Sequence, residues 1–196
     1  MWKCSIPEGK SGKWSIKRFS VNERNASISA FFDGKRKVPS GSYTKLVYEG
    51  GCFNDVVMSD TPAEYKDHRW IIRNAKGKVL IAGLGLGLVL EQVAGKDEVI
   101  SITIIESSAD VIKLVWEHIP EQIKAKCTLI HGDIYDLHNI DKSLHFDYAW
   151  FDIWPTICGD NTSDFGKLKT KYRNRVDIMG FWAEKECKQE NKRRRR

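Results

Sequence analysis

From Lys78 onward, short apolar runs alternate with segments in which apolar residues recur at helical spacing. Such runs are typical of parallel strands, and the segments between them predict helices that cover both faces of the sheet. The four predicted strands are VLIAG (79–83), Val99–Ile105, CTLIH (127–131) and FDYAWF (146–151). The predicted helices are Leu88–Ala94 and a longer one from Ser107. We therefore expect an α/β fold with a Rossmann-like, open and mostly parallel sheet.

Residues 13–57 have a different pattern. The stretches WSIKRFSV, ASISAFF, YTKLVYEG and FNDVVM are short, rich in β-formers and separated by glycine-containing turns, which predicts a small antiparallel β appendage. We divide the chain into this appendage (1–57), a Rossmann-like domain (58–188) and a basic disordered tail (189–196).

A helix start lies between these two parts. Thr61 is the expected N-cap, Pro62 takes the first helical position and Glu64 follows three residues after the cap. The helix is expected to run to about Ala75. Glu64 and His68 share one helix face, but the capping role is the preferred interpretation of Glu64, and no partner at ligand spacing makes His68 a metal ligand.

The C-terminal part is short. Residues 162–186 read best as one long or broken helix rich in Lys and Arg, and the fifth strand of a full Rossmann-like fold is not evident. Residues 178–182 are the alternative, a short edge strand. Four strands alone would leave FDYAWF near a sheet edge, which predicts a homo-oligomer that buries it.

Length and charge change this picture little. The 196 residues suit one domain with a small addition. Of the net charge of +6, Lys192–Arg196 supply five, so a weak nucleic-acid contact through this tail is the alternative to a solvated end. The five scattered cysteines indicate neither zinc nor disulfides. With no signal peptide or membrane-length apolar run, we expect a cytoplasmic protein, in the host cytoplasm if a phage encodes it.

Three glycines interrupt the first parallel strand where it turns into its helix, in the order Gly83-Leu84-Gly85-Leu86-Gly87. A turn of this kind lets a ligand approach the backbone and the N–H groups of the helix start. The second strand ends in Glu106, nineteen residues after Gly87, where a carboxylate can accept hydrogen bonds from ribose hydroxyls. The alternative is that Glu106 only favours the start of the next helix.

The third and fourth strands also end in carboxylates, Asp133 and Asp152. Ligands of open parallel sheets bind beyond the carboxyl ends of the strands, so both side chains and Glu106 are candidates for one site. Loop solvation and helix capping are the competing explanation for Asp133.

The stretches VLIAGLGLG, ITIIE, HGD and FDYAWFD together resemble the class I S-adenosylmethionine-dependent methyltransferases, in particular their spermidine synthase-like branch and small phage methyltransferase-like proteins. The resemblance covers residues 58–154. It implies a loop under the amino acid and ribose of S-adenosylmethionine, or of its decarboxylated form. The residues it implies as cofactor contacts are Gly83, Leu84, Gly85, Gly87, Glu106, Ser107, Asp133, Ile134 and Asp152. Residue spacing predicts no metal site.

Within that resemblance, Glu106 would hold the ribose, Asp133 the adenine amino group and Ile134 the ring. Asp152 would face the sulfonium and the substrate as the catalytic base. The sequence after Asp152 is Ile-Trp-Pro and not the polar loop of aminopropyltransferases, so methyl transfer to an unidentified nucleophile is the first expectation. The alternatives are aminopropyl transfer, a non-catalytic cofactor-binding protein and an NAD-linked oxidoreductase. The last lacks the usual G-x-G-x-x-G spacing.

Overall fold

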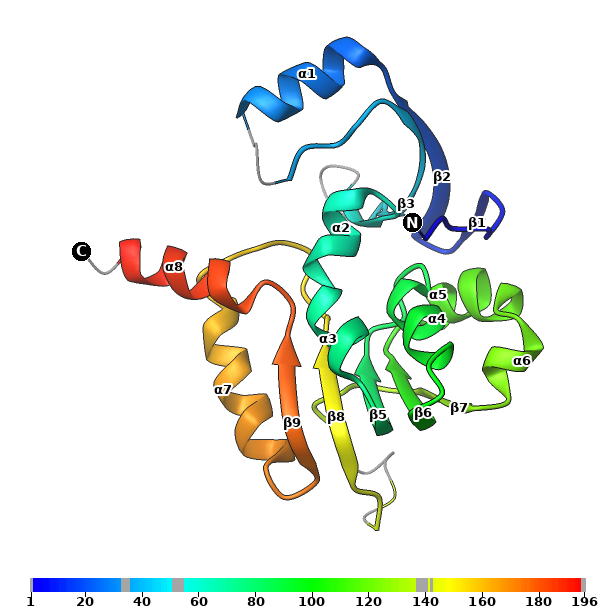
Figure 1. Cartoon of the computed structure of the whole chain (residues 1–196), viewed down its shortest axis with the longest axis vertical. Coiled ribbons are helices and arrows are strands. Elements are labelled where there is room, and N and C mark those ends of the chain that lie inside the picture. Colours follow the sequence, from blue (N-terminus) through cyan, green and yellow to red (C-terminus); the bar gives the residue numbers. More distant parts are fainter. Residues whose placement is uncertain (1, 33–35, 51–54, 137–140, 142, 195–196) are drawn as a thin grey trace.

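The computed structural model describes residues 2–32, 36–50, 55–136, 141 and 143–194, with the side chains of 28–32 left out. It contains two sheets (Figure 1). The smaller is antiparallel, in the order β1-β2-β3-β4, and the larger is parallel, in the order β7-β6-β5-β8-β9. The α/β, Rossmann-like fold predicted from the pattern is confirmed.

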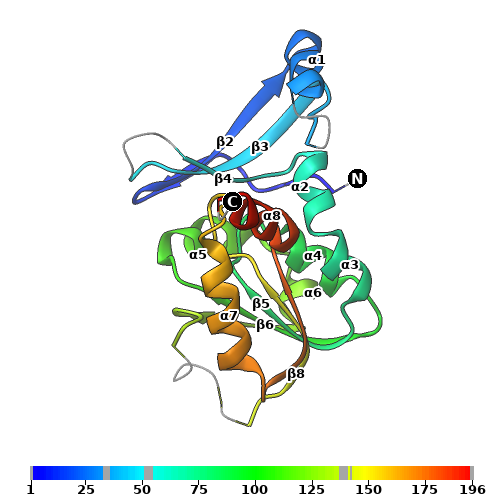
Figure 2. The same ribbon diagram turned by 90° about the vertical axis from the view of Figure 1, so that its left-hand side faces the viewer.

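The smaller sheet is built from β1 (Gly9–Ser11), β2 (Trp14–Val21), β3 (Gly41–Tyr48) and β4 (Asp55–Ser59). It lies over the carboxyl ends of the parallel strands, as both views show (Figures 1 and 2). The predicted turn at residues 33–34 lies outside the described residues. Of the predicted turn at residues 50–51, only Gly50 is described.

One predicted strand of this region is wrong. ASISAFF belongs to helix α1 (Glu23–Phe32). Its alternating pattern suggested a strand, but the side chain of Asn22 accepts a hydrogen bond from the backbone N–H of Asn25 (2.8 Å). Such a cap satisfies a backbone N–H group at a helix N-terminus. It favours a helix here although the apolar residues alternate.

The next helix begins where expected. Thr61 caps α2 (Pro62–Asp67), and its side chain accepts from the backbone N–H of Glu64. The predicted single helix to Ala75 is broken at His68, after which α3 (Arg69–Asn74) continues.

The parallel sheet follows the predicted order of elements. Its strands are β5 (Gly77–Ala82), β6 (Val99–Glu106), β7 (Cys127–His131), β8 (Phe146–Phe151) and β9 (Val176–Phe181). The connecting helices are α4 (Leu88–Ala94), α5 (Ala109–Val115), the 3-10 turn η1 (Trp116–His118), α6 (Glu121–Lys124) and α7 (Asn161–Tyr172). Helix α5 starts two residues later than expected because Ser108 is its N-cap. Figure 2 shows α7 on one side of this sheet and α3 with α4 on the other.

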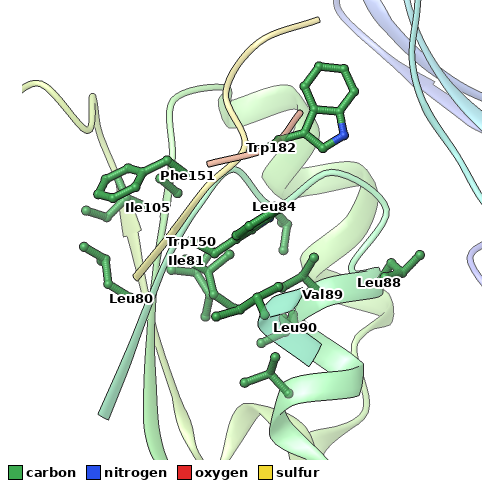
Figure 3. Close-up of a cluster of buried hydrophobic side chains, with 14 of the residues drawn as sticks. Leu80, Ile81, Leu84, Leu88, Val89, Leu90, Ile105, Trp150, Phe151 and Trp182 are labelled. Carbon is green, nitrogen blue, oxygen red and sulfur yellow. The ribbon is translucent and has the colours of Figure 1, made fainter. Parts of the chain in front are cut away.

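The core of this domain is the contact between the central strands and α4. Ile81 of β5, Trp150 of β8 and Leu90 of α4 are almost fully buried and lie together, whereas the equally buried Leu80 lies on the opposite face of β5, on the side of Ile105 and Phe151 (Figure 3). Since β5 and β8 are covered on both faces, their sequences are continuous apolar runs, which is why the pattern located them well.

The C-terminal part differs from the prediction. Residues 162–186 are not one helix: α7 is followed by strand β9 and then by α8 (Glu184–Arg194). Strand β9 pairs in parallel with β8, so the fifth strand is present and the preference for a helix there is wrong. A glycine inside a strand is unfavourable and weakens the strand pattern. Gly180 is nevertheless needed in β9, because a Cβ there would lie 2.3 Å from the ring of Trp70.

Two further expectations depended on that region. The tail predicted as disordered is helical from residue 189 to Arg194, while residues 195–196 lie outside the described residues. Strand β8 is not at an edge, so the strand count that favoured a homo-oligomer is wrong, and the oligomeric state stays a prediction. Among the described residues, no helix has the length and apolar character to cross a membrane.

Candidate functional site

The glycine turn lies at the carboxyl end of β5, beside the end of β8. Gly83, Gly85 and Gly87 all have positive φ, of 96°, 53° and 81°. A Cβ on Gly83 would lie 2.2 Å from the backbone oxygen of Asp152. No side chain fits between these two strand ends, so the glycine allows the backbone after β5 to pass against Asp152.

A cavity of about 560 Å³, called here the first cavity, opens between this turn and the smaller sheet. Most of the predicted site residues line it: Gly83, Gly85, Glu106, Ser107, Asp133, Ile134 and Asp152. Two of them do not. Leu84 has its side chain in the core, and Gly87 caps α4, with its Cα facing Ile119.

Glu106 ties the turn to the second strand. Its Oε2 accepts from the backbone N–H of Leu84 (2.9 Å), and its Oε1 accepts from that of Ser108 (2.8 Å). The side chain is nearly buried but still lines the first cavity. Glu106 therefore does stabilise the start of α5, as the alternative interpretation held. Its carboxylate keeps further lone pairs that can accept hydrogen bonds from a ligand.

The loop after β7 forms another wall. Asp133 Oδ1 accepts from the backbone N–H of Tyr135 (2.8 Å), and the hydroxyl of Tyr172 donates to the carbonyl of Ile134 (2.8 Å). The hydroxyl of Tyr135 is buried without a hydrogen-bond partner among the described residues. Burial raises the pKa of Tyr135 to about 12, so the hydroxyl stays protonated and can donate. Sequence reasoning missed this residue.

The smaller sheet contributes the opposite wall, which the sequence did not reveal. Trp14 and Tyr48 line the cavity with ring centroids 5.0 Å apart. Met58 of β4 reaches the glycine turn, where its Sδ accepts from the backbone N–H of Leu86 (3.1 Å). The predicted appendage is therefore part of the site.

Asp152 belongs to a buried charged cluster. Nε2 of His68 lies 3.6 Å from Oδ2 of Asp152 and 3.6 Å from Oε1 of Glu64. Burial raises the pKa of Asp152 to about 7, although His68 acts in the opposite direction. Burial disfavours the charged form of His68, but the neighbouring carboxylates outweigh it, and its pKa lies above the ordinary value. The pattern had placed Glu64 and His68 on one helix face but not against Asp152.

Arg36 closes the cluster on the far side. It forms ion pairs with Asp67 and, at 3.5 Å, with Oε2 of Glu64. The pKa of Asp67 is raised, chiefly by burial. Among the described residues, no group of three or more His, Cys, Asp or Glu side chains is arranged to hold a metal ion.

A second cavity of about 500 Å³ adjoins the first. The two share Val57, Met58 and Pro155 as lining residues. Glu64 lines the second cavity, as does Trp182, whose indole N–H is buried without a partner in the described part of the chain. Asp152 lines only the first, so the cluster of Glu64, His68 and Asp152 extends between the two.

No family model matches the sequence, and a search of curated proteins found no match. The chain is similar to several solved structures. For the spermidine synthase from Thermotoga maritima the identity is 17%, over 88% of this chain and 52% of the other, with a TM-score of 0.49. The glycopeptide N-methyltransferase MtfA, solved with S-adenosyl-L-methionine, is 18% identical over 57% of this chain and 45% of the other, with a TM-score of 0.42.

The Trypanosoma brucei PRMT1 enzyme-prozyme complex, solved with AdoHcy, is 18% identical over 58% of this chain and 36% of the other, with a TM-score of 0.43. The chain thus spans between 36% and 52% of the length of these three proteins. By their names they include an N-methyltransferase and a spermidine synthase. The phage-type branch stays a prediction. At such identities the likeness concerns the fold alone.

Proposed function

We propose that the protein is a group-transfer enzyme that binds S-adenosylmethionine, or its decarboxylated form, in the first cavity. Methyl transfer to an unidentified nucleophile is the first candidate reaction. The observation that carries the proposal is the meeting of two carboxylates, Glu106 and Asp152, in one cavity on the two sides of the glycine turn. Sites of open parallel sheets lie at such a position.

The residues of the cavity fit a sulfonium nucleoside. Its volume is within the range of small-molecule sites, about 300–1,000 Å³. Ile105 and Ile134 offer apolar surface for an adenine ring, and the unpartnered hydroxyl of Tyr135 offers a donor for a polar atom of the ligand. Glu106 has lone pairs left for ribose hydroxyls.

When bound, such a cofactor supplies an electrophilic carbon: the acceptor's lone pair forms the new bond, and the pair of the broken carbon–sulfur bond stays on sulfur. Asp152 would take the proton that the acceptor loses. A pKa of about 7 suits a general base at neutral pH. Its side chain keeps 20% of its surface exposed, so it can touch a bound acceptor.

One observation favours aminopropyl transfer as the second candidate. Four carboxylates line the first cavity, those of Asp55, Glu106, Asp133 and Asp152, and none of the described lining residues is Lys, Arg or His. S-adenosylmethionine carries a carboxylate that would find no cationic side chain here. Its decarboxylated form has only positive charges and suits the cavity better.

Isothermal titration calorimetry distinguishes these cofactors. We expect S-adenosylmethionine, the decarboxylated form and S-adenosylhomocysteine to bind, with the decarboxylated form the tightest if aminopropyl transfer is correct. Binding of NAD with none of the three would refute the proposal in favour of the oxidoreductase.

A radiolabelled methyl-transfer screen across amine, protein and nucleic-acid pools tests catalysis itself. We expect labelled product in one of the pools. Cofactor binding without turnover on any pool would support the non-catalytic alternative.

A further inference from the structure

His68 is the buried ionisable group for which the proposed chemistry gives no role. It is fully buried, and neither ring nitrogen has a hydrogen-bond partner among the described residues. Buried polar atoms in proteins are nearly always hydrogen-bonded, so a purely structural histidine would be expected to have partners. Trp150 packs edge-on against the ring, with centroids 5.8 Å apart, and holds it in place.

The same nitrogen of His68 faces two carboxylates. Nε2 lies at 3.6 Å from Asp152 Oδ2 and at 3.6 Å from Glu64 Oε1. Both distances exceed a hydrogen bond by about 0.5 Å, so a small rotation of either carboxylate makes the contact. One imidazole nitrogen can accept a proton from one acid and then donate it to the other.

The two carboxylates open into different cavities. Asp152 lines the first and Glu64 the second. A proton that reaches Asp152 therefore has a route away from the reacting groups that does not cross the cofactor site.

We propose that Glu64, His68 and Asp152 share protons as one unit that connects the first cavity to the second. This proposal rests on the proposed function, because the proton that enters the unit is the one the acceptor loses to Asp152. His68 is a positioning residue in it: it touches neither cofactor nor acceptor, and it acts through the two carboxylates.

Other charged groups face the unit and contribute to its titration. Those that face His68, Asp152 or Glu64 from the surrounding elements are Asp67, Glu106 and Arg36. Each of them is expected to shift the unit's titration through its charge.

The test is an NMR titration of the histidine ring signals in the full chain, with His68→Gln to assign the signal of His68. We expect Glu64→Gln and Asp152→Asn each to lower the midpoint of His68 by about 1 pH unit, as loss of a close opposite charge does. The exposed pair of His145 and Asp177 (2.7 Å) provides the matched control. Asp177→Asn should leave the midpoint of His68 unchanged.

A shift with only one of the two carboxylate variants would overturn the proposal, because the unit would then end at His68. A second measurement is calorimetry in two buffers of different ionisation enthalpy. We expect the wild-type protein to release protons when it binds S-adenosylmethionine, whose sulfonium favours ionised Asp152, and to release none with S-adenosylhomocysteine. Glu64→Gln removes one end of the unit and should change the number of protons released with S-adenosylmethionine. An unchanged number in this variant would also overturn the proposal. If neither ligand binds, the proposed function fails, and the NMR titration alone decides on the unit.

Discussion

Substitution of Glu106 separates its observed backbone contacts from its proposed contact with a ribose. Glu106→Ala removes the acceptor of two backbone N–H groups, those of Leu84 at 2.9 Å and Ser108 at 2.8 Å. A hydrogen bond to a charged group contributes about 1.5–3 kcal/mol, and the N–H of Ser108 is only partly buried, so water can replace one partner. We expect a loss of about 2–4 kcal/mol in the free energy of unfolding. Glu106→Gln keeps one acceptor oxygen and should lose about half as much.

Urea unfolding with and without S-adenosylhomocysteine measures both roles in one experiment. The loss without ligand reports the backbone contacts. A ligand at a hundred times its Kd stabilises the wild type by about 2.7 kcal/mol, and the variant that lacks the ribose acceptor should gain less. Glu121→Ala is the surface control, since that side chain is 87% exposed and should change stability by no more than about 0.5 kcal/mol.

Two results would refute this reasoning. If Glu106→Ala is as stable as Glu121→Ala, the two backbone contacts contribute nothing. If Glu106→Ala gains as much from the ligand as the wild type does, Glu106 does not hold the ribose and only stabilises the start of α5.

Three further substitutions have expected outcomes. Gly83→Ala should cost more than about 4 kcal/mol or prevent folding, because its Cβ would meet the backbone of Asp152 at 2.2 Å; a cost near 1 kcal/mol in urea unfolding would show that the strand ends can move apart. Gly166→Ala, in α7 with nothing within 4 Å, should stabilise by about 0.5–1 kcal/mol. The folded-state pKa of Asp152, about 7, is above the ordinary 3.8, so folding takes up a proton and wild-type stability falls as pH rises between these values. Asp152→Asn should remove this pH dependence and should be more stable than the wild type at pH 8 but not at pH 4. If the free energy of unfolding of the two proteins depends on pH in the same way, the pKa of Asp152 is not raised.

The sequence located the parallel strands because their burial is simple. Strands covered on both faces need apolar residues at nearly every position, and FDYAWF was predicted with the bounds that β8 has. CTLIH was predicted with the bounds of β7, although this edge strand is only partly buried. Helix α4 was also predicted with its bounds, since the glycine before it and Gly95 after it mark its ends.

Strand β9 could not be predicted from the hydrophobic pattern of the sequence. Val176–Phe181 contains a glycine and stands between two helices rich in charge, so its local sequence fits a helix as well as a strand. The strand is favoured by a tertiary contact: Trp70 and Trp150 stack with ring centroids 5.9 Å apart and leave room at Gly180 for backbone only. That contact joins residues distant in the chain and has no local signal.

The candidate site divides in the same way. Carboxylates at strand ends could be predicted because all parallel strands end at one edge of the sheet. Two contacts could not be predicted. The contact of His68 with Asp152 depends on how α2 and α3 pack against β8. The contact of Met58 with the glycine turn depends on how the smaller sheet sits over the larger one.

Several local departures from ordinary structure meet at that edge of the sheet. The turn after β5 has positive φ at alternate residues, Asp152 is an acid with a pKa of about 7, and His68 and Tyr135 hold buried polar atoms without partners in the described chain. Each of these costs stability, and a sequence selected for stability alone would have replaced them. A cavity with carboxylates on both sides of the turn gives several of them a common reason, since a bound cation would favour ionised Asp152 and a nucleoside would supply a partner for the hydroxyl of Tyr135. The strain is therefore best explained by a ligand that completes the site.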